Sequence, residues 1–285
     1  MKLIHPDVKI LDQAPGLTGV YDAICQAAAT CYKSEAKTGE QAKAFIDDVL
    51  IKRGHLAMLE FGTVYLTIPK DDYEQTFNKE RCPYVTKQAT VVEEDENNFY
   101  ITTNLRVLYE NNWMDDLECF QEPSEHHEKR YFVQFITSIG IGREFTRHRV
   151  FSFAQESTRY CNYSKDKFSK QVTFILPSWS KIEEGEYNLL QELGLLYPKD
   201  MAFARSCGVA EKHYFNLIES GAVPQEAREV LPLCTKADLC MCGFKKDWVH
   251  FMDLRFRGIT GKPHPDAQLI ATKLHKLFEE RGIDL

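Results

Sequence analysis

Residues 131–160 read YFVQFITSIGIGREFTRHRVFSFAQESTRY, and they carry the densest pattern in the chain. They begin with Tyr131 to Ser138, whose β-branched and aromatic residues predict a strand. Four basic residues then fall within seven positions: Arg143, Arg147, His148 and Arg149. Apolar residues are interleaved with them, which is unusual for a solvated face. The group is either a surface cluster stabilised by Glu144 or part of a ligand-binding site.

The residues after this basic cluster favour a binding site. If Phe151 to Tyr160 is extended, the alternation of side chains places Gln155, Ser157 and Arg159 on one side of the strand. Such a row of donors is able to hold an oxyanion or the edge of a nucleotide base. The other interpretation is a strand with a polar outer face.

Composition limits the class of protein. The chain has 285 residues, no apolar run long enough for a membrane span, and a start that lacks the apolar core of a secretion signal. Its nine cysteines have no regular spacing and fit reduced thiols, so we expect a cytoplasmic protein. The formal net charge of −7 argues against broad binding to nucleic acid. A pocket with a few arginines still suits a small anion.

The apolar pattern predicts a single α+β domain over residues 1–285, with a central mixed or antiparallel sheet flanked by helices and a helical C-terminal half. Strands are expected at Gly62–Ile68, Tyr84–Val92, Phe99–Thr103 and Tyr131–Ser138. Helices are expected at Thr18–Cys31, Gly39–Arg53, Glu184–Leu196, Ala202–Ser220, Pro224–Pro232, Ala237–Phe256 and Pro265–Arg281. Glu110–Lys129 is interpreted as a helix followed by a surface excursion.

Arg147-His148-Arg149, seven intervening residues and then Ser157 resemble the signature of flavin-dependent thymidylate synthases. Further segments are similar to other blocks of this family and follow in the same order: Ala28 and Ala29 before Cys31-Tyr32, Gly54-His55 with Glu60, Pro224 to Pro232, and Trp248 to Arg255. The resemblance therefore extends over most of the chain and implies the fold of that family.

The resemblance also implies an activity. Members of the family convert deoxyuridine monophosphate (dUMP) to thymidine monophosphate (dTMP), with methylenetetrahydrofolate as carbon donor and NADPH as reductant through FAD. They are typically homotetramers whose active sites are shared between subunits. By position, the residues that would contact dUMP are Glu144, Arg147, Gln155, Ser157, Arg159, Arg228 and Arg255. Those that would contact FAD are His55, Ala57, Arg147, His148, Arg149, Gln155, Lys246 and His250.

Arg255 is the expected catalytic residue. It matches the arginine that lies beside uracil N3 in the family, where a fixed cation stabilises the charge that develops on the ring. Its spacing from Trp248, Phe251 and Met252 also puts the guanidinium at the end of an apolar helix face. An arginine there needs an anionic or polar partner. A snorkelling arginine would have the same spacing.

Several positions depart from the family pattern. Phe244 and Lys246 stand where asparagine and arginine are common, Ala57 replaces a hydroxyl residue, and Gln155 replaces a glutamate. These replacements alter the expected contacts to FAD. Segments within about 87–129 and 256–265 are also longer than in compact members. Either segment caps the folate site or only thickens the surface.

Two local patterns have less specific interpretations. The adjacent His126 and His127 lack the i, i+4 spacing of a helical zinc pair, so we interpret them as part of a polar loop and expect no bound metal. Arg228 also has two interpretations. It either contacts dUMP, as the resemblance implies, or pairs with a neighbouring glutamate, Glu226 or Glu229.

Two alternatives to the thymidylate synthase remain from the sequence. The first is a related flavin-dependent enzyme that alkylates another pyrimidine nucleotide or uses another one-carbon donor. The second belongs to a different class and is a non-catalytic module in which the arginines bind nucleic acid, which the acidic net charge opposes.

Overall fold

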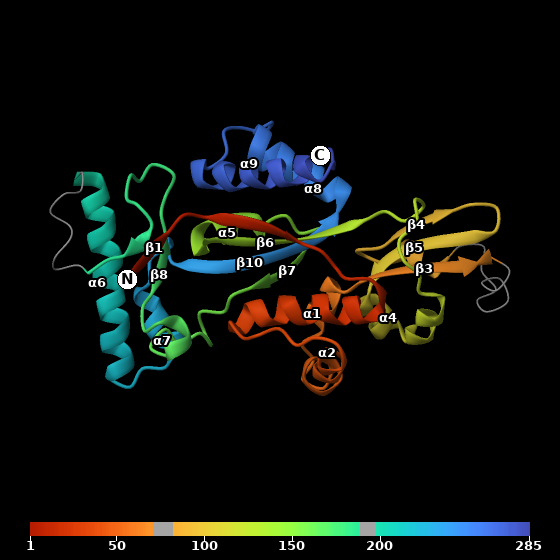
Figure 1. Cartoon of the computed structure of the whole chain (residues 1–285), viewed down its shortest axis with the longest axis horizontal. Helices are drawn as coiled ribbons and strands as arrows, with labels where there is room; N and C mark the ends of the chain where they lie inside the picture. The colour runs from red at the N-terminus through yellow and green to blue at the C-terminus, as the bar shows by residue number, and fades with distance from the viewer. Residues whose placement is uncertain (71–81, 189–197) are drawn as a thin grey trace.

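The computed structural model describes residues 1–70, 82–188 and 198–285, and it confirms an α+β architecture (Figure 1). The strands are β1 (Lys2–Ile4), β2 (Asp7–Leu11), β3 (Thr63–Pro69), β4 (Val91–Glu94), β5 (Asn98–Asn104), β6 (Arg130–Ser138), β7 (Ser152–Gln155), β8 (Thr173–Ile175), β9 (Gly185–Glu186) and β10 (Lys236–Phe244). The α-helices are α1 (Gly16–Tyr32), α2 (Glu40–Phe45), α4 (Leu105–Asn111), α5 (Ile139–Phe145), α6 (Pro198–Glu219), α7 (Pro224–Ala227), α8 (Lys245–Met252) and α9 (Pro265–Glu280).

Shorter helical segments connect these elements. The 3₁₀ helices are η2 (Leu56–Phe61), η3 (Pro83–Thr86), η4 (Met114–Cys119), η5 (Asp166–Phe168) and η7 (Arg228–Val230). Two π-helical turns continue α-helices: η1 (Ile46–Ile51) follows α2, and η8 (Asp253–Arg257) follows α8. None of the helices in the described ranges has both the length and the apolarity that crossing a lipid bilayer demands.

The central sheet has the order β2-β6-β10-β7, and every neighbouring pair in it is antiparallel. Helices cover both faces, with α8 and α9 on one side and α1 on the other (Figure 1). Phe135 of β6 and Met241 of β10 pack beneath α8, while Phe132 of β6 and Cys240 of β10 face α1. Because each buried large apolar side chain stabilises the fold by about 1.5–3 kcal/mol, this two-sided burial holds the sheet rigidly.

Two smaller sheets lie at opposite ends of the molecule (Figure 1). The antiparallel sheet β3-β5-β4 packs with α1, α2 and η2 around a separate apolar cluster. The other sheet has the order β8-β1-β9, with β1 parallel to β8, and its cluster includes residues of α6. The central sheet therefore joins two flanking units, and the candidate site residues come from its edges and connections.

Most of the predicted elements are confirmed. The predicted strands at 62–68, 99–103 and 131–138 correspond to β3, β5 and β6. The predicted helices at 18–31, 39–53, 202–220, 224–232 and 265–281 correspond to α1, α2 with η1, α6, α7 with η7, and α9.

The prediction of a helix over Ala237–Phe256 is wrong in its first half. Residues Lys236–Phe244 form β10, the strand between β6 and β7, and only the residues from Lys245 onward are helical. Both faces of β10 are buried, so its sequence is a nearly continuous apolar run without the alternation of a half-exposed strand. Such a run does not distinguish a central strand from a buried helix.

Three other predictions need correction. Tyr84–Val92 is not a strand, because Pro83 begins the 3₁₀ helix η3 and Ala89 has a positive φ of 52°, so extension starts only at Val91. The helix expected from Glu110 lies earlier, as α4, and ends at Asn111. The extension after Phe151 ends at Gln155, and the chain then turns.

The helix expected at Glu184–Leu196 falls partly on residues whose structure is not described. Gly185 and Glu186 form the short strand β9, so the predicted start of this helix is wrong. Residues 189–196 lie outside the described ranges. Three further short strands, β1, β2 and β8, were not predicted from the sequence.

Candidate functional site

The guanidinium of Arg255 lies on the π-helical turn η8 and makes three hydrogen bonds. Its Nη1 donates to Glu144 Oε2 at 2.9 Å, Nη2 donates to the Glu144 carbonyl at 2.9 Å, and Nε donates to His148 Nε2 at 3.0 Å. A guanidinium has five N–H donors, so these bonds leave one N–H on each terminal nitrogen for a ligand. The side chain is 17% exposed, and it remains accessible to a small molecule.

The local fold explains why Arg255 is so placed. Trp248, Phe251 and Met252 are fully buried against the central sheet, so α8 presents its next turn at the edge of the apolar core. Glu144 lies near the end of α5, whose start is capped by the Ser138 hydroxyl accepting from the Ile141 N–H at 3.2 Å. The guanidinium therefore has the anionic partner that the end of an apolar helix face requires.

His148 is the neutral partner of this arginine. Burial, together with the smaller effects of the nearby charges of Arg255 and His250, lowers the pKa of His148 to about 4. The ring is therefore uncharged at neutral pH. Because Nε2 accepts the hydrogen bond from Arg255, the ring proton lies on Nδ1.

The depressed pKa of His148 predicts a pH dependence of stability. Between about pH 6.5 and pH 4 the unfolded chain binds a proton at this ring that the folded chain does not, so the free energy of unfolding falls as the pH falls. Replacing His148 with glutamine, which is able to accept from Arg255 but does not titrate, should reduce this slope by up to about 1.4 kcal/mol per pH unit. Urea unfolding at several pH values measures it. The exposed His5→Gln is the control, and equal slopes for wild type and H148Q would contradict the assignment.

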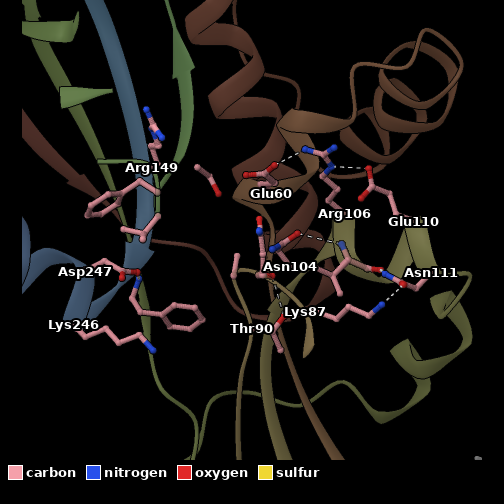
Figure 2. Close-up of a pocket in the computed structure, with 17 residues that line it drawn as sticks. Glu60, Lys87, Thr90, Asn104, Arg106, Glu110, Asn111, Arg149, Lys246 and Asp247 are labelled. Carbon is pink, nitrogen blue, oxygen red and sulfur yellow. Dashed lines mark hydrogen bonds and ion pairs between the residues drawn. The ribbon is translucent and has the colours of Figure 1, made fainter. Parts of the chain in front are cut away.

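A cavity of about 600 Å³ lies between two parts of the chain. Figure 2 shows Arg149, Lys246 and Asp247 on one side, and Asn104, Arg106, Glu110 and Asn111 on the other. The first side belongs to the connection before β7 and the start of α8, and the second to β5 and α4. Residues 87–90, from one of the two longer segments, also line the cavity.

The cations of this cavity divide into two kinds. Arg106 is neutralised, because it forms ion pairs with Glu60 at 2.6 Å and with Glu110 at 2.8 Å (Figure 2). Arg149 and Lys246 make no ion pair with any residue in the described ranges. Lys87, the other cation of the cavity without an ion pair in those ranges, donates to Asn111 Oδ1 at 2.7 Å. Arg149 and Lys246 are therefore the side chains most available to a bound anion.

A third group of predicted residues lies at the turn after β7. Arg228 Nη1 donates to Thr158 Oγ1 at 3.2 Å, and its Nε lies 3.5 Å from Glu229 Oε1, so the expected pairing with a neighbouring glutamate also occurs. The Ser157 N–H donates to the Cys31 carbonyl at 2.9 Å, which ties the turn to the end of α1. Arg159 is exposed.

Gln155 and Gly142 are packed closely where β7 passes α5. A Cβ atom added at Gly142 would lie 2.6 Å from Gln155 Nε2, so glycine at this position leaves room for the glutamine amide. Gln155 is half-buried, and its close packing against Gly142 holds its side chain in place beside the turn.

The remaining predicted residues are not brought together within one chain. Arg147 is exposed, and His250 lies beside the cluster, with its ring 6.1 Å from the ring of His148. His55 and Ala57 are exposed at the start of η2, and they do not line the 600 Å³ cavity, whereas Glu60 from the end of η2 does. The predicted residues thus fall into three groups, an arginine cluster, a cavity and a turn, and Arg147, His55 and Ala57 lie outside all three.

Sequence reasoning missed several residues of the cavity. Arg106 is the most informative, because it spans Glu60 and Glu110. Its i, i+4 spacing from Glu110, after the N-cap residue Asn104, was a signal for a helix at this place. Lys87, whose Nζ donates to Asn111 Oδ1 at 2.7 Å, had no such signal.

Comparison with known proteins identifies the family of the chain. Residues 120–281 match the model of the family described as thymidylate synthase complementing protein. The match covers more than half of the chain, and the chain belongs to this family.

The relatives found by sequence are named for an activity. A probable flavin-dependent thymidylate synthase of Paramecium bursaria Chlorella virus 1 is 28% identical over 137 residues, which is 47% of this chain and 60% of the relative. A flavin-dependent thymidylate synthase of Tropheryma whipplei strain TW08/27 is 27% identical over 169 residues, which is 55% of this chain and 66% of the relative. The chain thus spans less than two thirds of the length of these relatives.

Among solved structures, a UMP/dUMP methylase, PolB, from Streptomyces cacaoi is 16% identical to this chain. The superposition has a TM-score of 0.45 and covers 98% of this chain and 93% of the other.

Proposed function

We propose that the chain is a flavin-dependent thymidylate synthase, which methylates dUMP to dTMP with methylenetetrahydrofolate as carbon donor and NADPH as reductant. Membership of the family supports this proposal. The observation that carries it is the guanidinium of Arg255, which is fixed by Glu144 and His148 and keeps one N–H on each terminal nitrogen. A cation fixed in this way suits the negative charge that develops on a uracil ring as C5 becomes nucleophilic.

The residues of the cavity fit FAD. Arg149 and Lys246 would hold its phosphates through charge-assisted hydrogen bonds, and the aromatic rings of Phe151 and Phe244 line the same space. When bound, the flavin supplies the hydride that reduces the transferred carbon to a methyl group. The residues of the chain would orient the flavin and exclude water from it.

The nucleotide would be held by the turn and by the arginine cluster. Ser157, Arg159 and Arg228 would bind the phosphate, because guanidinium groups with a hydroxyl alongside make strong hydrogen bonds to a dianion. Arg255 would donate to the uracil ring. Glu144 keeps the guanidinium in place, and His148 accepts a hydrogen bond without adding a competing positive charge.

A shared active site in a homotetramer would explain the exposed predicted residues. Arg147 and Arg159 are solvent-exposed in the single chain, as are His55 and Ala57. In a site built between subunits, such residues would face the nucleotide or the flavin of a neighbouring copy. We therefore propose that the cavity, the cluster and the turn combine only in the oligomer.

Removing the two available cations should weaken flavin binding. The double substitution Arg149→Gln and Lys246→Gln is expected to raise the Kd for FAD at least about tenfold, because two charge-assisted hydrogen bonds to phosphate are lost. Fluorescence titration with FAD measures this change. The control is Lys245→Gln, which removes an exposed lysine from the neighbouring position of α8 outside the cavity. An unchanged Kd in the double variant would remove these residues from the flavin site.

An absorbance spectrum tests the proposal as a whole. The protein loaded with FAD should show a flavin spectrum that shifts when dUMP is added, because the uracil would lie against the flavin ring. A protein that takes up no flavin, or whose flavin spectrum does not respond to dUMP, would count against the proposal. This spectroscopic test does not require any substitution of a catalytic residue.

A further inference from the structure

A second cavity lies beside the turn after β7, between the end of α1 and the strands β1 and β8. Its volume is about 340 Å³, and it is lined by polar residues that none of the predicted roles includes: Lys2, Lys33, Glu156, Tyr163, Lys167 and Lys236. Neither Arg255 nor the residues of the 600 Å³ cavity contribute to it. Its chemistry is therefore separate from the site described above.

The innermost charges of this cavity neutralise one another. Lys236 Nζ lies 2.9 Å from Glu156 Oε2 and 2.6 Å from Asp238 Oδ1, and Lys33 forms ion pairs with the same two carboxylates. The side chains of Glu156 and Asp238 are only 1% and 5% exposed. Burial lowers the pKa of Lys33, but Glu156 and Asp238 together outweigh it, and the pKa is raised. Lys33 is therefore charged at neutral pH, and the formal charges of the two lysines and the two carboxylates sum to zero.

Two further lysines give the cavity an excess of positive charge. Lys167 Nζ is fixed at the cavity, because it donates to the carbonyls of Tyr32 at 3.1 Å and Lys33 at 3.3 Å. Lys2 is exposed, and neither Lys2 nor Lys167 forms an ion pair with a residue in the described ranges. Four lysines against two carboxylates leave two positive charges.

Tyr163 provides a second, independent indication of a ligand. This residue lines the cavity and is 4% exposed, yet its hydroxyl has no hydrogen-bond partner among the residues that the structure describes. Burial raises the pKa of Tyr163 well above its usual range, and the nearby Glu156 adds to the effect. The hydroxyl therefore stays protonated, and it is able to donate to an oxyanion.

We propose that this cavity binds the phosphate group of a small phosphomonoester. The excess of two positive charges matches a phosphate dianion, and ammonium groups at Lys2 and Lys167 with the Tyr163 hydroxyl supply donors for its oxygens. A volume of about 340 Å³ leaves space beside the phosphate for a sugar or a nucleoside. The proposal does not depend on thymidylate synthesis, because it uses no residue assigned to that reaction.

Calorimetric titration of the full-length protein tests this site, with inorganic phosphate in one arm and uridine monophosphate in the other. The double variant Lys2→Gln and Lys167→Gln should lose at least about tenfold in affinity at this site, because two charge-assisted contacts are removed. Lys170→Gln is the matched control, since Lys170 is an exposed lysine three positions along that pairs with Asp166 and does not line the cavity. Arg228→Gln separates this site from the proposed dUMP site.

The outcomes are distinct. Binding of either probe that persists in K170Q and R228Q but weakens in K2Q/K167Q supports the site, provided that the double variant unfolds at the wild-type temperature. Phosphate and uridine monophosphate binding together indicates a nucleotide-sized ligand, and phosphate alone a smaller one. Loss of all binding in R228Q, or no binding to the wild type in either arm, would overturn the proposal. Unchanged affinity for both probes in K2Q/K167Q would overturn it as well.

Discussion

Replacing Arg255 with alanine is expected to lower the rate of dTMP formation by about 10²- to 10³-fold, which corresponds to about 3–4 kcal/mol of transition-state stabilisation. The expected loss follows from the geometry of the guanidinium. Its three hydrogen bonds to Glu144 and His148 fix the cation before the substrate arrives, so little reorganisation is needed as charge develops on the uracil. A steady-state assay with saturating FAD and varied dUMP measures kcat and KM separately.

The comparison that isolates this effect uses the same helical turn. Arg257 also lies on η8, but it pairs with Asp253 at 2.9 Å and is more exposed, so Arg257→Ala should retain activity within about twofold of wild type. Arg255→Lys keeps the charge and loses the planar fork, and it should recover only part of the rate. FAD binding should be unchanged in all three variants. A fully active R255A protein would remove the catalytic role assigned to this arginine.

Replacing Glu156 with alanine is expected to lower the free energy of unfolding by about 3–5 kcal/mol. Glu156 Oε2 accepts from Lys236 at 2.9 Å and from the Asp238 N–H at 3.2 Å, and it also pairs with Lys33. Without this carboxylate, two partly buried lysines would share a single anion, and a buried N–H would lose its acceptor. The affected contacts join α1, β10 and the turn after β7, so the loss falls on the centre of the fold.

Urea unfolding of E156A measures this loss, and an exposed pair supplies the reference. Asp166 pairs with Lys170 at 3.2 Å with both side chains largely exposed, so Asp166→Ala should change the free energy of unfolding by less than about 1 kcal/mol. Replacing Glu156 and Lys236 together with leucine should recover part of the stability, because no unpaired charge then remains. A loss in E156A no larger than that in D166A would show that the buried charges do not stabilise the chain.

Two strands, β6 and β10, show how far local sequence is sufficient to predict the fold. β6 was predicted correctly, since aromatic and β-branched residues fill it. β10 was mistaken for a helix because the strands on each side and the helices on both faces bury every side chain from Ala237 to Phe244. That burial depends on residues far away in the sequence. Local periodicity does not contain this information.

The candidate site, like the strands, could be predicted from the sequence only in part. The signature at Arg147 to Ser157 pointed to a nucleotide and a flavin, and Arg255 was placed correctly at the end of an apolar face. Arg255 forms hydrogen bonds with Glu144 and His148, which lie more than 100 positions away in the sequence. These contacts follow only from the packing of α8 against α5. The wall formed by residues 87–90 and by Arg106 likewise comes from segments that flank β4 and β5, and no local pattern specifies where these segments lie.

The most direct test of the account is to ask whether the chain makes dTMP. Purified protein loaded with FAD would be incubated with dUMP, methylenetetrahydrofolate and NADPH, and the nucleotides would be separated and identified by mass spectrometry. The account predicts a product heavier than dUMP by one methylene group that appears only when all the components are present, and that forms about 10²- to 10³-fold more slowly with R255A. Unchanged dUMP after prolonged incubation of flavin-loaded protein, or methylation of a different nucleotide only, would contradict it.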